Sequence, residues 1–278
     1  MKISWKFKSF IFSLIDLFNA TSLLYFLQKH VTKRARIANI DVSPIWRRHR
    51  NILQKFNATS FILEFGAGQS LVQNLYLSDL VEKQLLVDLN PMIDFDLVES
   101  ARKLLSQKYP LRANSKIYND DDLNKYGIWY RAPYDASSTD IGDSTLDACI
   151  STNTLEHIPP QSIENIFNEL YRVLKPTGIV SAKIDYSDHY AHTDKNISLF
   201  NYLKYSNKEW KKYNHNCHYQ NRLRHYEYIK IFKVAGFDVI DEELIFDEKN
   251  IPADITELYK EKDMTWQATS AHIVLRKN

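Results

Sequence analysis

Residues 61–70 read FILEFGAGQS, an apolar run that ends in an acid and then turns on two glycines. Gly66 and Gly68 supply what a chain needs where it turns sharply after a strand and comes close to a ligand. Glu64, just ahead of the turn, indicates a cofactor with a positive or hydroxyl-rich group rather than a bare phosphate. A second apolar run ends in Asp88. In open α/β sheets a carboxylate at such a strand end, about 20 residues past the glycine turn, is placed to bind ribose hydroxyls.

Short apolar runs alternate with helical patterns through most of the chain. Strands are predicted at 60–65, 84–89, 129–134, 147–152, 179–185, 238–245 and 271–276, with helices at 69–80, 92–107, 161–174 and 224–235. This alternation predicts an α/β fold with a doubly wound, mostly parallel seven-stranded sheet. A loop and not a long helix joins the last two strands, which predicts an antiparallel strand at that edge.

The composition is that of an ordinary globular protein, with 278 residues, 44% hydrophobic and 25% charged. A net charge of +2 without a basic stripe gives no case for a nucleic-acid partner, for which a concentrated basic face is expected. The two cysteines, Cys149 and Cys217, lie far apart and predict neither a disulfide framework nor a zinc site. We therefore expect a reducing, cytoplasmic location.

The first forty residues combine a basic start, an apolar middle and a basic end. Asp16 and Asn19 interrupt the apolar run, which is too short to span a membrane and is followed by no cleavage site of a signal peptide. Two amphipathic helices are predicted, at 4–18 and 21–34, within an N-terminal helical cover over residues 1–50. We expect these helices to cover the cofactor cleft, and weak peripheral contact with an anionic membrane surface is the alternative.

The segment 186–222 has no clean period and is rich in His, Asn, Tyr and Lys. Loops of this length inside a compact domain are usually functional, so we expect this insertion to face the substrate. Its aromatic side chains either pack together or hold ring-shaped substrates, and packing is the favoured interpretation for most of them. Arg222 and Arg224 are candidates for binding a phosphate or carboxylate, with a structural role as the alternative.

Five short motifs occur in order and at fitting spacing: Glu64-Phe65-Gly66-Ala67-Gly68, Asp88, Asp135-Ala136, Leu155-Glu156-His157-Ile158 and Leu174-Lys175-Pro176-Thr177-Gly178. Together they resemble a class I S-adenosylmethionine-dependent methyltransferase of the small-molecule type. The resemblance covers about residues 58–185 and makes 51–278 a methyltransferase domain with the substrate-facing insertion at about 186–222. The region after residue 185 is also similar to methyltransferase-like proteins of bacterial surface-polysaccharide clusters.

The resemblance implies S-adenosyl-L-methionine as the cofactor. In that family the first turn and the turn after the fourth strand hold the methionine end, an acid after the second strand binds the ribose hydroxyls, and an acid after the third touches the adenine amine. In this sequence the methionine end would be held by Glu64, Gly66, Gly68, Thr152, Asn153 and Thr154. Asp88 would bind the ribose hydroxyls, and Asp135 with Ala136 would meet the adenine. One departure is Ser70, which stands near the place of a common third glycine.

Methyl transfer asks mainly that an acceptor be aligned with the activated sulfonium methyl and that water be excluded. A sugar hydroxyl also needs a base within hydrogen-bond reach. His189, His157 and Asp185 are the catalytic candidates because they follow strand ends on the predicted cofactor rim, and histidine titrates in the useful range. A divalent ion on Asp185, Asp188, His189 and His192 is an alternative activator, but no tight ligand motif supports it and no metal is predicted.

The predicted function is methyl transfer to a small molecule or glycan, with O-methylation of a sugar hydroxyl in polysaccharide biosynthesis preferred. Two alternatives stay open: a cofactor-binding subunit without activity of its own, and C- or N-methylation of a lipid, quinone or other metabolite. A nicotinamide-dependent oxidoreductase is disfavoured, because Leu71 stands where G-x-G-x-x-G requires its third glycine and Glu64 would have no role.

Overall fold

The computed structural model describes residues 4–18, 42–247 and 251–278. Its centre is a seven-stranded sheet in the order β3-β2-β1-β4-β5-β7-β6. The strands are β1 (Phe61–Phe65), β2 (Lys83–Val87), β3 (Ile128–Arg131), β4 (Leu146–Thr152), β5 (Leu174–Asp185), β6 (Phe237–Phe246) and β7 (Ala268–Lys277). Neighbouring strands are parallel except that β7 runs antiparallel to both β5 and β6. The predicted doubly wound sheet is confirmed, and its antiparallel strand near that edge is β7.

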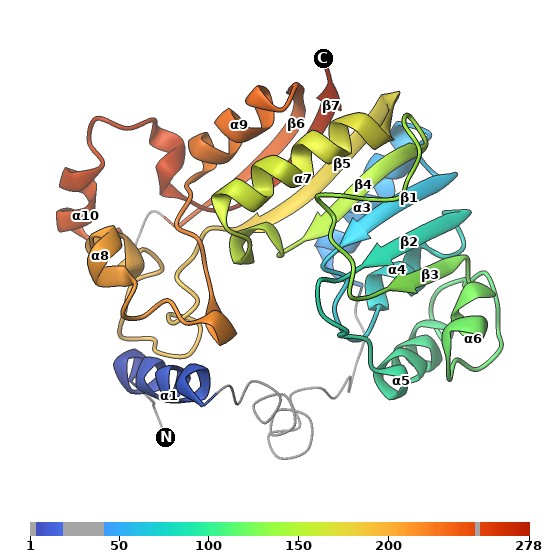
Figure 1. Ribbon diagram of the computed structural model, residues 1–278, viewed down its shortest axis with the longest axis horizontal. Coiled ribbons are helices and arrows are strands. Elements are labelled where there is room, and N and C mark those ends of the chain that lie inside the picture. The colour runs from blue at the N-terminus through green and yellow to red at the C-terminus, as the bar shows by residue number, and fades with distance from the viewer. Residues whose placement is uncertain (1–3, 19–41, 248–250) are drawn as a thin grey trace.

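Helices cover both faces of the sheet (Figure 1). One face carries α7 (Pro160–Val173) and α9 (His225–Val234), and the other carries α3 (Pro44–Lys55), α4 (Val72–Leu77) and α5 (Phe95–Leu105). Each layer of helices buries its apolar side chains against the sheet in a hydrophobic cluster of its own. Burial on both faces explains why the central strands read as nearly continuous apolar runs.

Helix α7 shows how the sequence specifies these elements. Pro160 occupies its first turn, where a missing backbone N–H costs nothing. Ile163, Phe167 and Leu170 follow at helical spacing and are fully buried. The helix ends at Val173, directly before β5, so the helix predicted over 161–174 is confirmed within one residue.

The helix predicted at 69–80 is shorter in the structure. Gly66 and Gly68 both have φ of +76°, and Leu71 is left-handed with φ of 47°. These residues keep the chain turning, so helical geometry starts only at Val72. The next helix also starts later than predicted, at Phe95, because the carboxylate of the preceding Asp94 caps the backbone N–H groups of its first turn.

Further helices lie at the periphery of the molecule: α1 (Trp5–Leu17), α6 (Asp120–Asn124), α8 (Asn207–Trp210) and α10 (Ala253–Leu258). Helix α1 matches the helix predicted at 4–18, whereas the one predicted at 21–34 falls outside the described residues. Of the predicted N-terminal cover, α1 packs on the insertion and α3 packs on the sheet (Figure 1). Across the described ranges, no helix combines the length and apolar character needed to cross a membrane.

Candidate active site

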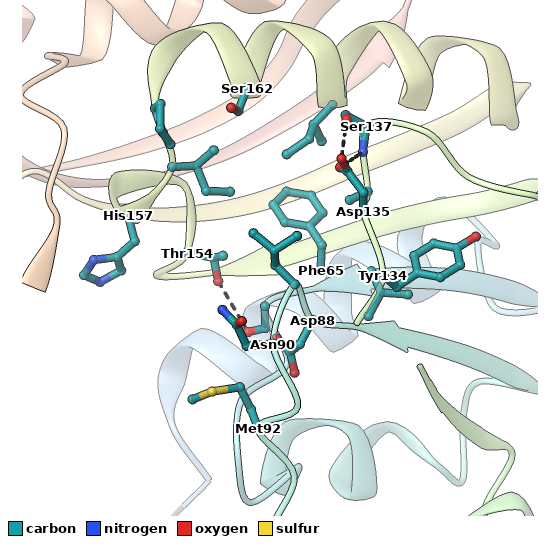
Figure 2. Close-up of a pocket in the computed structure, with 17 residues that line it drawn as sticks. Phe65, Asp88, Asn90, Met92, Tyr134, Asp135, Ser137, Thr154, His157 and Ser162 are labelled. Atoms are coloured by element: carbon teal, nitrogen blue, oxygen red, sulfur yellow. Dashed lines mark hydrogen bonds between the residues drawn. The ribbon is translucent and has the colours of Figure 1, made fainter. Parts of the chain in front are cut away.

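A cavity of about 360 Å³ opens at the carboxyl ends of the parallel strands (Figure 2). Ligands bind at this edge in open α/β sheets. The predicted site residues that line it are Gly66, Asp88, Asp135, Ala136, Thr154 and His157. The other predicted site residues lie beneath or beside the cavity and not in its lining: Glu64, Gly68, Thr152, Asn153, Asp185 and His189.

The glycine turn brings backbone against the cavity floor. A Cβ placed on Gly66 would overlap the side chain of Thr154, whereas one on Gly68 would meet open space. The Thr154 hydroxyl donates to the carbonyl oxygen of Gly66 at 3.4 Å, a contact drawn in Figure 2. The first turn and the turn after β4 therefore touch only because residue 66 has no side chain.

Glu64 is buried at the end of β1, and both of its carboxylate oxygens are occupied. Gln73 Nε2 donates to one at 2.9 Å and Asn74 Nδ2 to the other at 2.5 Å. Burial raises the pKa of Glu64 to about 7 despite these two bonds. The carboxylate thus ties α4 to β1, and its direct contact with a cofactor stays a prediction.

Asp88 follows β2 and faces the cavity. Tyr130 donates its hydroxyl to Asp88 Oδ2 at 2.9 Å from the neighbouring strand β3. Burial raises the pKa of Asp88 to about 6, and hydrogen bonds from Tyr130 and the backbone of Gly68 and Ala67 partly oppose that rise. The carboxylate retains accepting capacity toward the cavity, as a partner of ribose hydroxyls requires.

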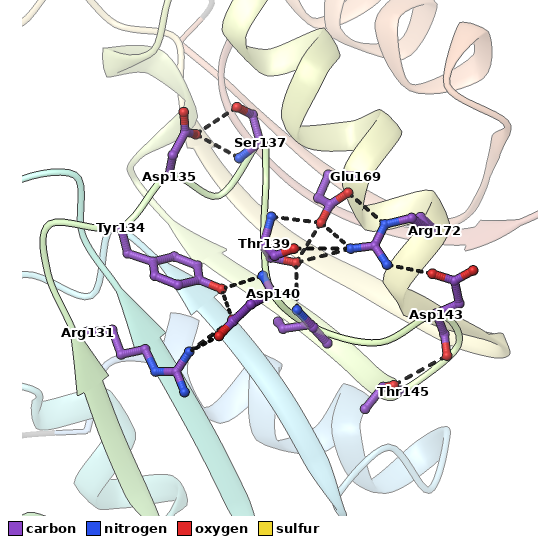
Figure 3. A network of polar contacts seen from close by, with 11 residues as sticks. Arg131, Tyr134, Asp135, Ser137, Thr139, Asp140, Asp143, Thr145, Glu169 and Arg172 are labelled. Carbon is purple, nitrogen blue, oxygen red and sulfur yellow. Dashed lines mark hydrogen bonds and ion pairs between the residues drawn. The ribbon is translucent and has the colours of Figure 1, made fainter.

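Asp135 lies on the loop after β3, and its Oδ1 accepts hydrogen bonds from the backbone N–H and hydroxyl of Ser137. A polar network holds the rest of this loop in place (Figure 3). Thr139 donates to Glu169 of α7, and Glu169 in turn pairs with Arg172 at 2.5 Å. The loop that carries Asp135 and Ala136 is therefore fastened to a helix on the same side of the cavity.

Thr152 belongs to a buried chain of polar groups under the sheet end. Gln73 donates to Glu64, so the Gln73 carbonyl oxygen must accept from the Thr152 hydroxyl, at 3.1 Å. Thr152 must then accept from His49 Nε2, which leaves His49 Nδ1 to accept from Ser181 at 2.8 Å. His272 Nε2 completes the chain by donating to Ser181 at 2.9 Å.

Both imidazoles of this chain are neutral. Burial lowers the pKa of His49 to about 3 and that of His272 to about 2. This chain of hydrogen bonds joins α3, β4, β5 and β7, and its donors all point the same way, toward Glu64. Thr152 is committed to this network, and its contact with a cofactor stays a prediction, as does that of Asn153, whose backbone N–H donates to the Lys183 carbonyl.

Histidines gather at the mouth of the cavity, as the sequence analysis expects. The His157 and His189 rings have centroids 4.9 Å apart. Asp185 Oδ2 lies 3.6 Å from Nε2 of both His189 and His192. Burial acts to raise the pKa of Asp185, but the nearby His189 and the hydrogen bonds from Ser187 hold it at about 2. Asp185 is thus an anion beside the imidazoles.

The two arginines considered as phosphate or carboxylate ligands have structural roles. Arg224 is fully buried and donates to the backbone carbonyls of Tyr186 and Trp266. Arg222 donates to the carbonyl oxygen of Tyr202 at 3.0 Å. Both guanidinium groups therefore hold the insertion together, which supports the structural alternative.

Sequence reasoning assigned no role to several residues of the site. Tyr130 supports Asp88, Gln73 and Asn74 hold Glu64, and Glu156 lies buried beside the histidines. The signal for Glu156 was present, since it directly precedes His157 at a strand end. Tyr130 gave no signal because its partner comes from a neighbouring strand far along the chain.

The strand order, the reversed β7, the glycine turn and the acid after β2 together define a class I S-adenosylmethionine-dependent methyltransferase. Residues 63–182 match a family model described as "Methyltransferase domain". The chain therefore contains a methyltransferase domain of this class, and its cofactor is S-adenosylmethionine. No curated protein matches the chain in sequence.

Solved structures of methyltransferases are similar to this chain at low sequence identity. The 1,6-didemethyltoxoflavin-N1-methyltransferase of Burkholderia thailandensis, with bound 1,6-didemethyltoxoflavin and S-adenosylhomocysteine, is 14% identical at a TM-score of 0.52, over 94% of this chain and 89% of that one. An S-adenosylmethionine-dependent methyltransferase of Clostridium acetobutylicum is 10% identical at a TM-score of 0.49, over 93% and 99%. A TehB-like methyltransferase of Corynebacterium glutamicum is 13% identical at a TM-score of 0.48, over 94% and 99%.

Proposed function

We propose that this methyltransferase transfers the methyl group of S-adenosylmethionine to a hydroxyl of a small molecule or glycan, and that the preferred acceptor is a sugar. In this proposal Asp88 binds the ribose hydroxyls and Asp135 meets the adenine amine. Gly66 and Thr154 border the methionine end. The Burkholderia enzyme, which shares the fold, has 1,6-didemethyltoxoflavin and S-adenosylhomocysteine bound together, which supports a small-molecule acceptor here.

The observation that carries the proposal is the histidine pair at the mouth of the cavity. His157 lines the cavity, and the His189 ring lies 4.9 Å from it, backed by the Asp185 carboxylate. An acceptor that reaches the sulfonium methyl from this side would pass these imidazoles. Because a hydroxyl is a poor nucleophile until its proton is removed, bases at this position favour an oxygen acceptor.

The insertion at about 186–222 is proposed to form the acceptor side of the site. Its buried aromatic residues pack with α1 in a separate cluster that includes Trp5, Tyr190, Tyr202 and Trp210. These side chains pack the insertion together, and the insertion carries His189 to the cavity mouth. Acceptor choice would then depend on the rim residues of this insertion, and a place in polysaccharide biosynthesis follows only if the acceptor is a sugar.

The test is methyl transfer from labelled S-adenosylmethionine to a panel of methyl glycosides and nucleotide-linked hexoses, with catechols and amines as the comparison. We expect transfer to a sugar hydroxyl. His189→Ala should lower turnover about 100- to 10,000-fold, the usual worth of a positioned base, and this loss should shrink at high pH. Calorimetry with S-adenosylhomocysteine should give an unchanged affinity for that variant. Transfer to amines alone, or full turnover by His189→Ala, would refute the proposal.

A further inference from the structure

Three side chains with metal-ligating groups converge beside the cavity mouth. Glu156 and His157 lie in the single helical turn Leu155–His157 after β4, and His189 lies on the loop after β5. One donor atom of each lies within 4.8 Å of the others. The set comes from two neighbouring strand ends, so the sheet itself brings it together.

Glu156 is a buried carboxylate that lacks a hydrogen bond of normal geometry among the described residues. It is 1% exposed, and within the described part of the chain neither of its oxygens has a hydrogen bond of normal geometry. A buried acid left in this state costs free energy unless a proton or a cation neutralises it.

The hydrogen bonds around the two histidines differ. His157 Nδ1 lies 2.8 Å from the carbonyl oxygen of Tyr219, which can only accept, so Nδ1 carries the proton and Nε2 the lone pair. A ring nitrogen that donates to a backbone carbonyl is the usual second contact of a metal-bound histidine. In the described ranges the buried His189 Nε2 makes no hydrogen bond of normal geometry, and Asp185 Oδ2 lies 3.6 Å from it.

The segment 219–221 positions both ligand-bearing turns. Besides the Tyr219 carbonyl, the Gln220 side chain accepts from the backbone N–H of His189 at 3.2 Å. Asn221 Nδ2 donates to the carbonyl oxygens of Leu155 and Ile158, both at 2.8 Å, and so clamps the turn that carries Glu156. The three donors are thus held from behind by one short segment of the insertion.

We propose that Glu156, His157 and His189 bind one divalent transition-metal ion at the mouth of the cofactor cavity. Two imidazoles and a carboxylate suit Zn²⁺, Mn²⁺, Fe²⁺ or Co²⁺ and leave coordination positions open, as catalytic metal sites do. Bonds to such ions measure about 2.0–2.2 Å, so each donor needs to move inward by less than ~1 Å to close the set.

The role of the ion rests on the proposed function, whereas its binding does not. An acceptor hydroxyl that coordinates the ion becomes more acidic, and its proton leaves to water. The resulting alkoxide oxygen forms a bond to the methyl carbon while the carbon–sulfur bond breaks and its electron pair stays on sulfur, giving neutral S-adenosylhomocysteine. In the loaded enzyme the two imidazoles are ligands, and the ion takes the place of a histidine base.

The binding test uses full-length protein that has been treated with a chelator and dialysed. Calorimetry with ZnCl₂, MnCl₂ and CoCl₂ in separate titrations should show one ion per chain for at least one metal, and Co²⁺ should give visible absorption bands. Glu156→Gln, His157→Ala and His189→Ala should each weaken binding at least tenfold. The matched control is His192→Ala, on the same loop but outside the set, which should stay within twofold. Retained S-adenosylhomocysteine binding will show that each variant is folded.

Several outcomes separate this inference from the proposed function. Absence of binding by all three metals, or equal affinity in wild type and the three ligand variants, overturns the metal site. Metal binding with unchanged sugar methylation after chelation overturns the activating role and leaves His189 as the base. Metal binding without methylation of any hydroxyl refutes the proposed function and leaves the site intact.

Discussion

Three acids near the cofactor cavity differ in what satisfies their oxygens. Glu64 has an amide donor on each oxygen, and Asp88 has Tyr130 on one. Glu156 has none of normal geometry among the described residues. The three carboxylates are therefore suited to different tasks: Glu64 to fastening a helix, Asp88 to accepting ligand hydroxyls, and Glu156 to meeting a cation.

Asp88 should make cofactor binding depend on pH. Only its ionised form can accept hydrogen bonds from both ribose hydroxyls, and burial raises its pKa to about 6. Affinity for S-adenosylhomocysteine should therefore be constant above about pH 7 and fall as the pH drops through 6. Asp88→Asn should weaken binding by about 1.5–3 kcal/mol at pH 7.5 and remove this dependence. Calorimetry from pH 5 to 8 measures both effects.

Tyr130→Phe is the matched variant for that experiment. It removes a hydrogen bond that lowers the pKa of Asp88, so the midpoint of the affinity curve should move to higher pH. Wild-type affinity in Asp88→Asn at pH 7.5 would remove Asp88 from the ribose site.

Single residues were predictable where their role depends on local backbone. Gly66 and Asp88 could be located because a strand end and a turn leave a signature of a few neighbouring residues. Tyr130, His49 and Tyr219 could not, because their partners come from other strands or from the far end of a loop. His49 occupies the buried face of α3 together with Ile52 and Leu53, a pattern that marks burial but not hydrogen bonding.

At the scale of elements, the contact between the first turn and the turn after β4 depends on Gly66. Gly66→Ala should lower the stability of the protein in two ways, through the positive φ and through overlap with Thr154. Gly68→Ala should lower it only through the positive φ. We expect Gly66→Ala to lose about 1–3 kcal/mol more than Gly68→Ala, the usual cost of overpacking. Urea unfolding measures this difference.

A double variant isolates the steric part of that loss. Thr154→Gly should recover stability in Gly66→Ala and lower it or leave it unchanged in Gly68→Ala, because only residue 66 lies against Thr154. Similar losses in the two single variants without recovery would mean that backbone strain alone explains both.

Helices and strands were predictable where the hydrophobic period agreed with the residues that start and stop an element. Helix α7 has both, and its bounds were predicted within one residue. Helix α4 was predicted too long because a left-handed Leu71 extends the turn, and a non-glycine residue in that conformation has no sequence signature. The short helices of the insertion were missed because contacts with residues far away in the sequence, and not an amphipathic period, hold them in place.

At the scale of the whole molecule, the buried chain through His49 and His272 should limit stability in acid. Both side chains titrate at 6.5 when unfolded, but burial holds their folded pKa values at about 3 and about 2. The unfolded state thus binds protons first, and stability present above pH 6.5 is lost as the pH falls. Well below 6.5 each histidine should contribute about 1.4 kcal/mol per pH unit to that loss.

Urea unfolding at pH 7.5, 6.0 and 5.0 tests this expectation. His272→Gln is expected to be less stable at pH 7.5, since it disturbs the bond to Ser181, but its stability should fall less steeply with acid than that of wild type. An identical slope in the variant and wild type would show that the two histidines gain protons without unfolding.

The N-terminal helix packs against the insertion at about 186–222. Helix α1 lies beside the insertion (Figure 1), and the Trp5 ring packs against Tyr190, Tyr205 and Tyr213 with centroids 4.8–5.8 Å apart. Asp16 at its other end accepts hydrogen bonds from the backbone N–H groups of residues 216 and 217. The insertion that carries His189 is thus braced by residues from the start of the chain.

Trp5→Ala should therefore loosen the acceptor side and spare the cofactor side. Truncation of a buried Trp typically costs about 3–5 kcal/mol of stability. We expect this loss to exceed the free energy that holds a short helix such as α1 on the insertion. Amide hydrogen exchange should speed up across 186–222 but not in β1 or β2. Affinity for S-adenosylhomocysteine should stay within twofold, while turnover falls because His189 is no longer held at the cavity mouth. Phe10→Ala is the control, an exposed aromatic on the same helix that should change none of these readouts. Faster exchange throughout the sheet, or equal effects of the two variants, would show that α1 does not act through the insertion.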